Sequence, residues 1–321
     1  MTLRLAARAG GAALLALCAG VPLAAQGTGT TAGLVLEVPP TARALGLGGA
    51  YAAVVGDAGD VFVNPAGMAT IHHLAFGGSW ERSLFGTTYT SGAFAARVGH
   101  FDLGVGLALL DFGGDSVVTP DPLDPDRGVA SGATISAYQA LGVGAVAYRR
   151  GMISVGASLK ALQEHIGDGT ASSYGARGVT GDVGVAVAVF DLMAIGAVAE
   201  NVGGRLTSEG QRLALPRTVR VGFTINLVDP QGPTRLMTTT DYVAPPGGDD
   251  YWAVGVEGGA VHQAIGLVGR LGIALGRAPS DRSSLVYGGT VQIKGMRLDW
   301  SYQPYDAVGG ATQRFGLRWL W

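Results

Sequence analysis

Bulky apolar residues fall on every second position through most of this sequence, and glycine, alanine, serine or polar residues stand between them. In the segment 101–109, the two sets are Phe101, Leu103, Val105, Leu107 and Leu109 against Asp102, Gly104, Gly106 and Ala108. The same alternation recurs over 153–160, 183–189, 219–227 and 296–303. A period of two is typical of β-strands with one apolar face. The pattern therefore predicts an all-β protein in which nearly every strand carries a large apolar face.

Composition decides which kind of all-β protein this is. Only 14% of the 321 residues are charged and 54 are glycine, whereas about a quarter of an ordinary chain is charged and about 7% is glycine. An exported soluble sandwich needs a charged outer face. A transmembrane barrel instead turns bulky residues toward lipid and small or polar ones toward its lumen. The sequence predicts a transmembrane antiparallel β-barrel. The net charge of −2 gives no reason to expect nucleic-acid binding.

A membrane-spanning helix is the competing interpretation, and its best candidate is the segment 183–199. That segment carries Asp191 at its centre, where a charge costs a few kcal/mol in lipid. Its first half also alternates with period two rather than with helical period. We therefore interpret it as two strands joined near Asp191.

About 14 strands can be assigned, an even number as in bacterial barrels. They are expected to begin near Leu74, Gly86, His100, Ala133, Met152, Thr180, Leu192, Arg217, Thr234, Tyr251, Ala264, Leu285, Met296 and Gln313. Short turns are expected near Gly99, Asp191 and Gly295, and long polar loops over 113–132 and 166–178. Short turns normally face the periplasm and long loops the exterior.

The two ends of the chain carry targeting signals. Arg4 and Arg8 precede an apolar run that ends in small residues, which predicts a secretory signal peptide over residues 1–25. The single cysteine, Cys18, lies in this segment; a lipoprotein signal would acylate it, but Leu17 is large where such signals have a small residue. The last strand ends on alternating aromatic and apolar residues and resembles the signal read by the outer-membrane assembly machinery, namely Phe315, Leu317, Trp319 and Trp321.

No catalytic, cofactor or metal motif stands out. Gly114–Ser116 is ordinary turn chemistry, and Ser79 lacks the second glycine of a nucleophile elbow. The five histidines show no metal-binding spacing. The stretch 44–69 has neither a full dinucleotide-binding fingerprint nor a Walker lysine. Asp57 and Asp60 could offer oxygens to a cation, but we favour turn residues or partners of a barrel arginine. We therefore expect no enzyme, no cofactor and no metal.

One segment resembles a known family. The stretch 42–69 is similar to the N-terminal signature of the PorV/PorQ family, which belongs to the FadL-like superfamily of outer-membrane barrels. The matching residues are Arg43, Gly46, Gly48, Gly49, Ala50, Asp57, Asn64, Pro65, Ala66 and Gly67. Later stretches resemble the family in the same order: 156–162, 201–204, 215–223 and 297–304.

The resemblance implies a 14-stranded barrel whose N-terminal segment, residues 26–73, folds inward as a lumenal hatch, with the barrel over 74–321. Gly104, Gly106, Gly142, Gly144 and Gly184 would face the lumen and make room for it. Arg43, Asp57 and Asp60 would dock the hatch against Arg220, Arg297, Arg314 or Arg318. Further polar residues expected in the lumen are Lys160 and Asp299.

The resemblance also implies a function in the outer membrane. FadL-type members pass hydrophobic solutes, so the first hypothesis is a passive channel for hydrophobic small molecules, gated by the hatch. It predicts a continuous apolar pocket beside residues 42–69 and a gap where a strand of the wall bends. PorV-type members act in type IX secretion, so the alternative is an accessory that binds exported cargo proteins; a structural barrel is a third possibility. Expected partners are membrane lipid, the assembly machinery, and a hydrophobic molecule or a cargo protein.

Overall fold

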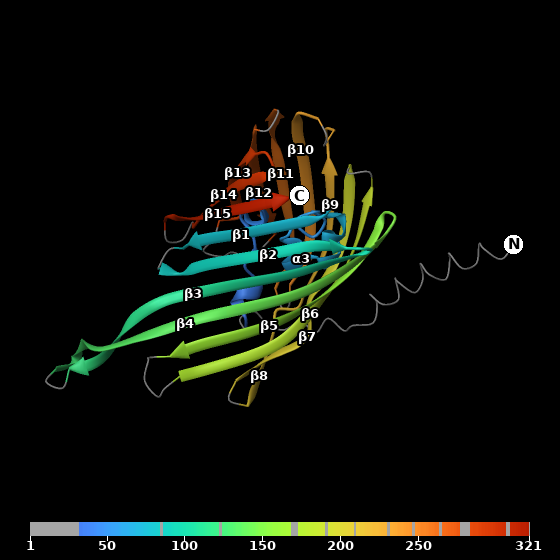
Figure 1. The fold of residues 1–321 in the computed structure, drawn as a ribbon. Helices are drawn as coiled ribbons and strands as arrows, with labels where there is room; N and C mark the ends of the chain where they lie inside the picture. Colours follow the sequence, from blue (N-terminus) through green and yellow to red (C-terminus); the bar gives the residue numbers. More distant parts are fainter. Residues whose placement is uncertain are drawn as a thin grey trace.

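The fold is a closed antiparallel β-barrel of 14 strands, with an additional short strand outside the closed ring (Figure 1). The computed structural model describes residues 32–83, 86–121, 124–167, 173–189, 192–208, 210–229, 232–245, 248–262, 265–276, 283–305 and 309–320. The expected signal peptide, Cys18, Asp191 and Trp321 lie outside the described residues. No described helix is long and apolar enough to cross a membrane.

The strands follow the sequence in antiparallel order. They are β1 (Leu74–Arg82), β2 (Thr88–Val98), β3 (Phe101–Asp121), β4 (Asp124–Arg150), β5 (Ile153–Gly167), β6 (Ser173–Val189), β7 (Met193–Ser208), β8 (Gln211–Ala214), β9 (Thr218–Asn226), β10 (Thr234–Ala244), β11 (Tyr251–His262), β12 (Ile265–Leu275), β13 (Leu285–Ile293), β14 (Met296–Pro304) and β15 (Ala311–Leu320). The first and last strands pair with each other, and β6 pairs with β7, which closes the ring. The prediction of 14 barrel strands is confirmed.

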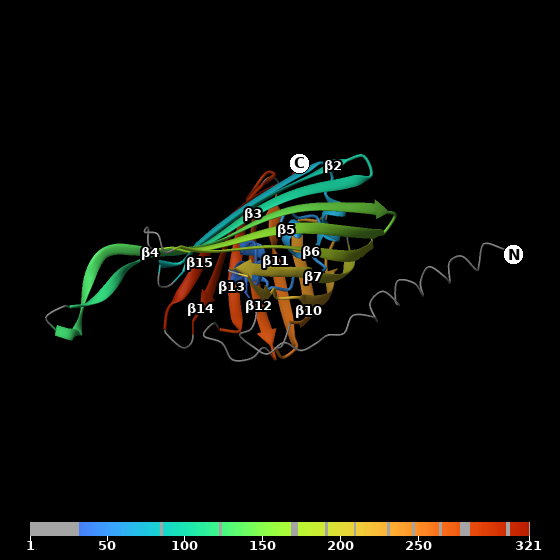
Figure 2. The same cartoon turned by 90° about the horizontal axis from the view of Figure 1, so that it is seen from below.

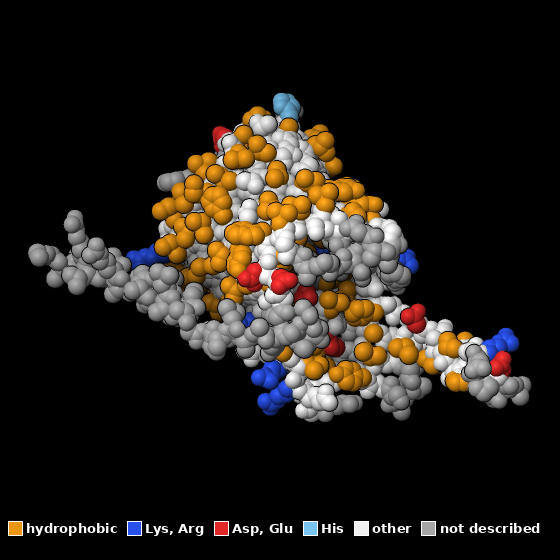
Figure 3. All heavy atoms as spheres, turned by 180° about the vertical axis from the view of Figure 1, so that it is seen from behind, with side chains coloured by type: hydrophobic (Ala, Val, Ile, Leu, Met, Phe, Trp, Pro, Cys, Tyr) orange, Lys and Arg blue, Asp and Glu red, His pale blue; other side chains and the backbone are white. Residues whose placement is uncertain are grey.

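Alternation along each strand separates an apolar outer face from a lumenal face. Leu103, Leu107 and Val183 expose 48%, 71% and 61% of their surface, whereas their neighbours Asp102 and Asp182 are buried. Figure 3 shows the broad hydrophobic surface that results. Because the strands of the ring pair with one another and most of the outer face is apolar, this barrel suits a bilayer, where backbone groups must find their partners within the protein.

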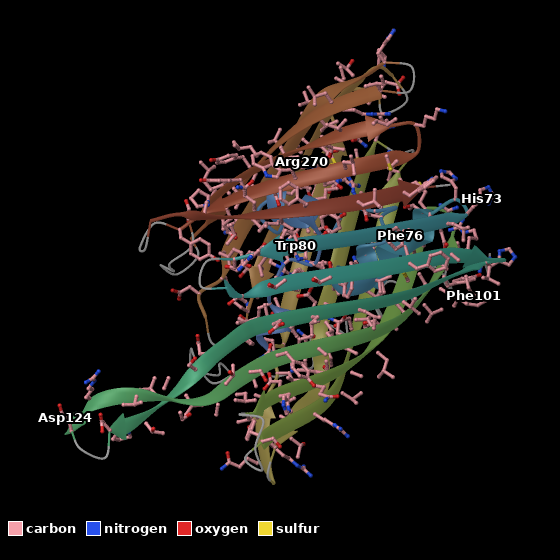
Figure 4. The ribbon with its side chains drawn as sticks, turned by 60° about the vertical axis from the view of Figure 1, so that its left-hand side comes forward. His73, Phe76, Trp80, Phe101, Asp124 and Arg270 are labelled. Atoms are coloured by element: carbon pink, nitrogen blue, oxygen red, sulfur yellow. The ribbon has the colours of Figure 1, made fainter. Side chains whose placement is uncertain are left out.

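We call the two ends of the barrel the turn end, where β2 joins β3 and β13 joins β14 through short turns, and the loop end, where β3 joins β4 and β12 joins β13. Figure 4 places His73 and Phe101 at the turn end, while Asp124 lies at the tip of the β3–β4 hairpin beyond the loop end. The prediction of a loop over 113–132 is wrong, because β3 and β4 continue to pair with each other there, with three register shifts. Polar residues and Pro120 hid the strand pattern. The predicted loop 166–178 is also shorter, since β5 reaches Gly167 and β6 begins at Ser173.

Two glycines predicted to face the lumen face outward instead. In β4 the buried, inward positions hold Leu141 and Val143, so the positions between them, Gly142 and Gly144, lie on the lipid side. No heavy atom lies within 4 Å of a Cβ placed on Gly144, as expected for an open outer surface. The alternation of β4 thus overrides the expectation that its glycines make room inside.

Residues 32–73, here called the lumenal segment, run inside the barrel (Figures 1 and 2). Their short elements are η1 (Leu34–Leu36), α2 (Ala42–Gly46), α3 (Asp60–Val63) and η2 (Pro65–Thr70). Thr41 caps α2 by accepting a hydrogen bond from the backbone N–H of Ala44, and Asn64 caps η2 in the same way. Between residues 42 and 71 most side chains are buried. Gly48, Gly49 and Gly56 adopt positive φ, which lets the chain turn tightly within the lumen.

A ring of inward-facing glycines forms the seat of the lumenal segment. A Cβ on many of them would lie less than 3 Å from atoms of the segment, closer than real side chains approach. The strongest cases face the backbone of the segment and lie on four strands: Gly156, Gly196, Gly255 and Gly272. Glycine at these positions lets the backbone of the segment touch the barrel wall directly.

Gly272→Val should therefore displace the lumenal segment and leave the barrel intact. The added side chain meets the backbone of Leu47 and Gly48, and such overpacking costs about 2 kcal/mol. Gly269→Val is the matched control, because Gly269 lies on the same strand and faces outward. Limited proteolysis of the detergent-solubilised barrel measures the effect. Cleavage within residues 42–71 should accelerate in the first variant only; equal cleavage of the two variants would contradict the assignment of the seat.

Candidate functional site: the occupied lumen

Six charged side chains form a closed ring of alternating sign between the lumenal segment and the wall. Arg318 contacts Asp57 at 2.7 Å and Asp299 at 2.5 Å. Arg270 contacts Asp299 at 3.1 Å and Glu257 at 2.6 Å. Arg43 completes the ring, 3.0 Å from Glu257 and 3.6 Å from Asp57. Three cations and three anions balance, so the ring is neutral as a unit.

The ring joins parts of the chain that are far apart in sequence. Arg43 and Asp57 come from the lumenal segment, while the other four come from β11, β12, β14 and β15. Figure 4 marks Arg270 on its strand. On β13, which lies between β12 and β14, the Thr290 hydroxyl accepts a hydrogen bond from Arg270 and donates one to Asp299. All five consecutive strands therefore contribute to holding one segment.

Burial and charge act in opposite directions on the two carboxyl groups of the segment. Burial alone would raise the pKa of Asp57, but the guanidinium groups of Arg318 and Arg43 hold it well below its usual range. For Asp60, burial and the neighbouring Asp57 charge raise the pKa well above its usual value. Asp57 is thus a charged docking group, while the carboxyl of Asp60 favours the neutral form.

Other contacts fix the rest of the segment. On β10, the carboxylate of Asp241 accepts hydrogen bonds of 2.8 Å from the backbone N–H groups of Tyr51 and Ala52. Arg220 pairs with Glu200 at 2.9 Å and donates to the carbonyl of Gly49. Near the turn end, Arg97 pairs with Asp102 and donates to the carbonyl of Ala69. A further arginine, Arg314, binds Glu81 at 2.8 Å and the carbonyl of Pro39.

A cavity of about 300 Å³ lies between the lumenal segment and the wall, toward the loop end. Its apolar lining includes Val38, Leu45, Phe62, Leu141 and Val286, and its polar lining includes Lys160, Glu200 and Arg220. This cavity reaches the lower end of the size range of ligand pockets. The channel hypothesis predicted a pocket in this place, although its lining is mixed rather than purely apolar.

The hydrogen bonding of the wall is interrupted at one place. Strand β7 pairs with β9 only from Met193 to Glu200, and beyond that point it pairs with β8. Within the described ranges, β8 has no second strand partner. The backbone N–H of Ala32 instead donates to the carbonyl of Ala214 at 2.9 Å. The start of the lumenal segment thus covers the free edge of β8.

The predicted docking residues meet only in part. The pair Asp57–Arg318 is among the expected ones, and Arg220 and Arg314 reach backbone carbonyls of the segment. Asp60 touches none of the four arginines: one oxygen accepts from the backbone N–H of Asp57, and the other lacks a partner. Arg297 forms no ion pair with another described residue and sits half-buried on β14. Lys160 pairs with Asp182 across β5 and β6.

Two ring members, Glu257 and Arg270, and the capping carboxylate of Asp241 were not predicted. Each occupies an inward position on its strand, and on β11 and β12 the outer face is apolar, which is the signal that could have found Glu257 and Arg270. The alternation shows that such residues face the lumen, but it does not show which of them lie at the same level along the barrel axis. The pairings depend on the stagger of five strands, which no local pattern encodes.

The serines considered as candidate nucleophiles in the sequence make ordinary structural contacts. The Ser79 hydroxyl accepts a hydrogen bond from the backbone N–H of Ala42 at 3.0 Å, and Ser116 pairs with Thr134 in the long hairpin. In the part of the chain that is described, no three His, Cys, Asp or Glu side chains are grouped to hold a metal. Of the proposed assembly signal, Phe315 and Trp319 expose 50% and 42% of their surface on the outer face of β15.

Comparisons with solved structures show that this fold occurs in outer-membrane transporters. The toluene transporter TbuX of Ralstonia pickettii superposes with a TM-score of 0.59 at 15% identity, over 88% of this chain and 98% of that one. The Pseudomonas putida toluene transporter TodX gives 0.56 at 11% identity, over 87% and 96%. A Pseudomonas aeruginosa FadL homologue gives 0.52 at 12% identity, over 88% and 98%. No protein-family model and no curated protein sequence matches. The shared feature is the FadL-type fold.

Asp57→Asn and Asp60→Asn should separate a docking charge from a neutral buried carboxyl. The first substitution leaves Arg318 and Arg43 without their shared anion, and breaking a buried pair costs about 3 kcal/mol. Asp60→Asn replaces a carboxyl group that favours the neutral form with a neutral amide of the same size. The rate of proteolysis within residues 42–71 reports how often the segment opens. This rate should increase on the order of a hundredfold in Asp57→Asn and stay unchanged in Asp60→Asn. Equal acceleration in both variants would refute the role of the ring.

Proposed function

We propose that this protein is an outer-membrane channel for small hydrophobic molecules, closed by a plug that must move to let them pass. The observation that carries the proposal is the cavity between the lumenal segment and the wall, inside a barrel of FadL-type fold. The plug is residues 26–73, of which 32–73 are described. Apart from its chain connection to β1, the plug contacts the wall through ion pairs, hydrogen bonds and apolar packing, so it can move without breaking a covalent bond.

The proposed orientation follows from the ends of the barrel. Short turns normally face the periplasm and long loops the exterior, so the β3–β4 hairpin would extend outward from the cell. A solute would enter among the loops and reach the cavity beside Phe62 and Leu141. Displacement of the segment would then open the way, either through the lumen or along the free edge of β8.

A solute for such a site has a particular chemistry. Apolar side chains line one part of the cavity, and Lys160, Glu200 and Arg220 line the rest. The two cations of the cavity lining already pair with carboxylates: Lys160 with Asp182 at 2.8 Å, and Arg220 with Glu200 at 2.9 Å. A neutral hydrophobic molecule therefore fits without displacing an ion pair, which favours hydrocarbons over fatty acids. TbuX and TodX are toluene transporters, and toluene is the natural probe.

The alternative function in type IX secretion stays a prediction, because no described contact and no comparison bears on cargo proteins. The same holds for membership of the PorV/PorQ family. Affinity purification of the native protein followed by identification of bound exported proteins addresses both.

A disulfide that locks the plug tests the proposed function. A Cβ on Gly77 of β1 would lie 3.7 Å from the Cβ of Ala58, within the range for a disulfide, about 3.5–4.5 Å. The double variant Ala58→Cys with Gly77→Cys should lose toluene uptake when oxidised and regain it on reduction, measured with radiolabelled toluene in Gram-negative cells. Each single variant is a control. Uptake that is equal in the oxidised and reduced states would overturn the moving plug.

A further inference from the structure

The outer face of the barrel carries a groove of about 1140 Å³ that crosses β2 to β7 toward the loop end. No residue of the lumenal segment lines it, and most of its lining side chains point outward. One row of cross-strand neighbours shows why it is hollow. The row is Gly92, Leu107, Gly142, Ala161, Val179 and Arg205. Small residues at three of these positions leave the space that side chains normally fill on a lipid-facing wall.

Exposed arginines gather at the β6–β8 end of this groove. Arg177 and Arg205 both line it. Because Val179 pairs with Arg205, Arg177 lies diagonally across from Arg205 on the same face. The next strand adds Arg212, which pairs with Thr207, itself the partner of Arg177. Within the described ranges, no ion pair joins these three guanidinium groups to another residue, and all three are exposed.

Arginines without an ion-pair partner among the described residues, on an apolar outer wall, favour an anion at the membrane surface. Arginine binds phosphate through planar, bidentate hydrogen bonds. In the row that ends at Arg205, the other positions from Gly92 to Val179 are apolar or small, which suits an acyl chain. The positive end of the groove lies toward the loops, where the head groups of the outer leaflet meet the barrel in the proposed orientation.

We infer that this groove and its arginines form a binding site for a phosphorylated, multiply acylated lipid of the outer leaflet. Its phosphates would contact Arg177, Arg205 and Arg212, while one acyl chain would lie along Gly142 and Ala161. The site is on the lipid side of the wall, so it does not depend on what passes through the lumen.

Binding of bisphosphorylated lipid A to the full chain, measured by native mass spectrometry in detergent, tests the site. Arg177→Gln with Arg205→Gln should weaken binding about tenfold or more, because it removes charge-assisted hydrogen bonds to phosphate. The matched control is Arg149→Gln with Arg150→Gln, which removes two exposed arginines at the turn end. An equal loss in both double variants, or no loss in the first, would overturn the inference.

A second variant tests the groove while leaving the arginines in place. A Cβ on Gly142 has only the Leu107 side chain nearby, at 3.8 Å, so Gly142→Leu fits the folded barrel. It should fill the groove and weaken lipid A binding several-fold, with phosphatidylethanolamine as the comparison lipid. A difference in electrophoretic mobility between heated and unheated samples verifies that the barrel is folded. Lipid A binding equal to that of the wild type would show that no acyl chain lies there, and would overturn the site as proposed.

Discussion

The neutral ring of Arg43, Asp57, Glu257, Arg270, Asp299 and Arg318 is the interaction on which the interior of this barrel depends. Four strands point charges into a closed lumen, where an unpaired charge is costly. The lumenal segment supplies the cation and the anion that complete the alternation. The segment and the wall are therefore electrostatically complementary: without the segment, Glu257 and Arg318 would each keep only one of their two ion-pair partners. The glycine seat acts together with the ring, because it brings the backbone close enough for these short contacts.

Polar contacts and an apolar core hold the plug together, and in that core Val61, Phe62 and Met68 pack in one cluster with inward side chains of the wall such as Leu110 and Leu141. Buried ion pairs specify a position well but contribute little net stability, because desolvation offsets their attraction. Hydrogen bonds from Tyr51 and Ala52 to Asp241 add direction in the same way. Such a segment has one well-defined seat and can still leave it when water or a solute enters. This combination suits a gate, and it accounts for charged residues inside a protein with only 14% charge.

Local patterns in the sequence predict the wall but not the site. Strands β10 and β11 begin at Thr234 and Tyr251, as expected, because alternation with period two is a local property of the backbone. The same rule, applied to β4, would have placed Gly142 outward; the assumption that glycines face the lumen was wrong. Arg43 was predicted to dock, but its partner Glu257 was not, because the level of Glu257 along the barrel axis depends on strand stagger. Long-range register is the information that a single sequence lacks.

The central claim is that the lumenal segment is a separable plug that a hydrophobic solute displaces. Amide hydrogen exchange of the intact protein in lipid nanodiscs, with and without toluene, tests it most directly. Residues 42–71 should be protected without solute and should exchange faster with it, while strands β11 to β15 stay protected. Exchange of these residues that is unchanged by toluene, or that rises together with that of the strands, would contradict a plug that moves within a rigid barrel.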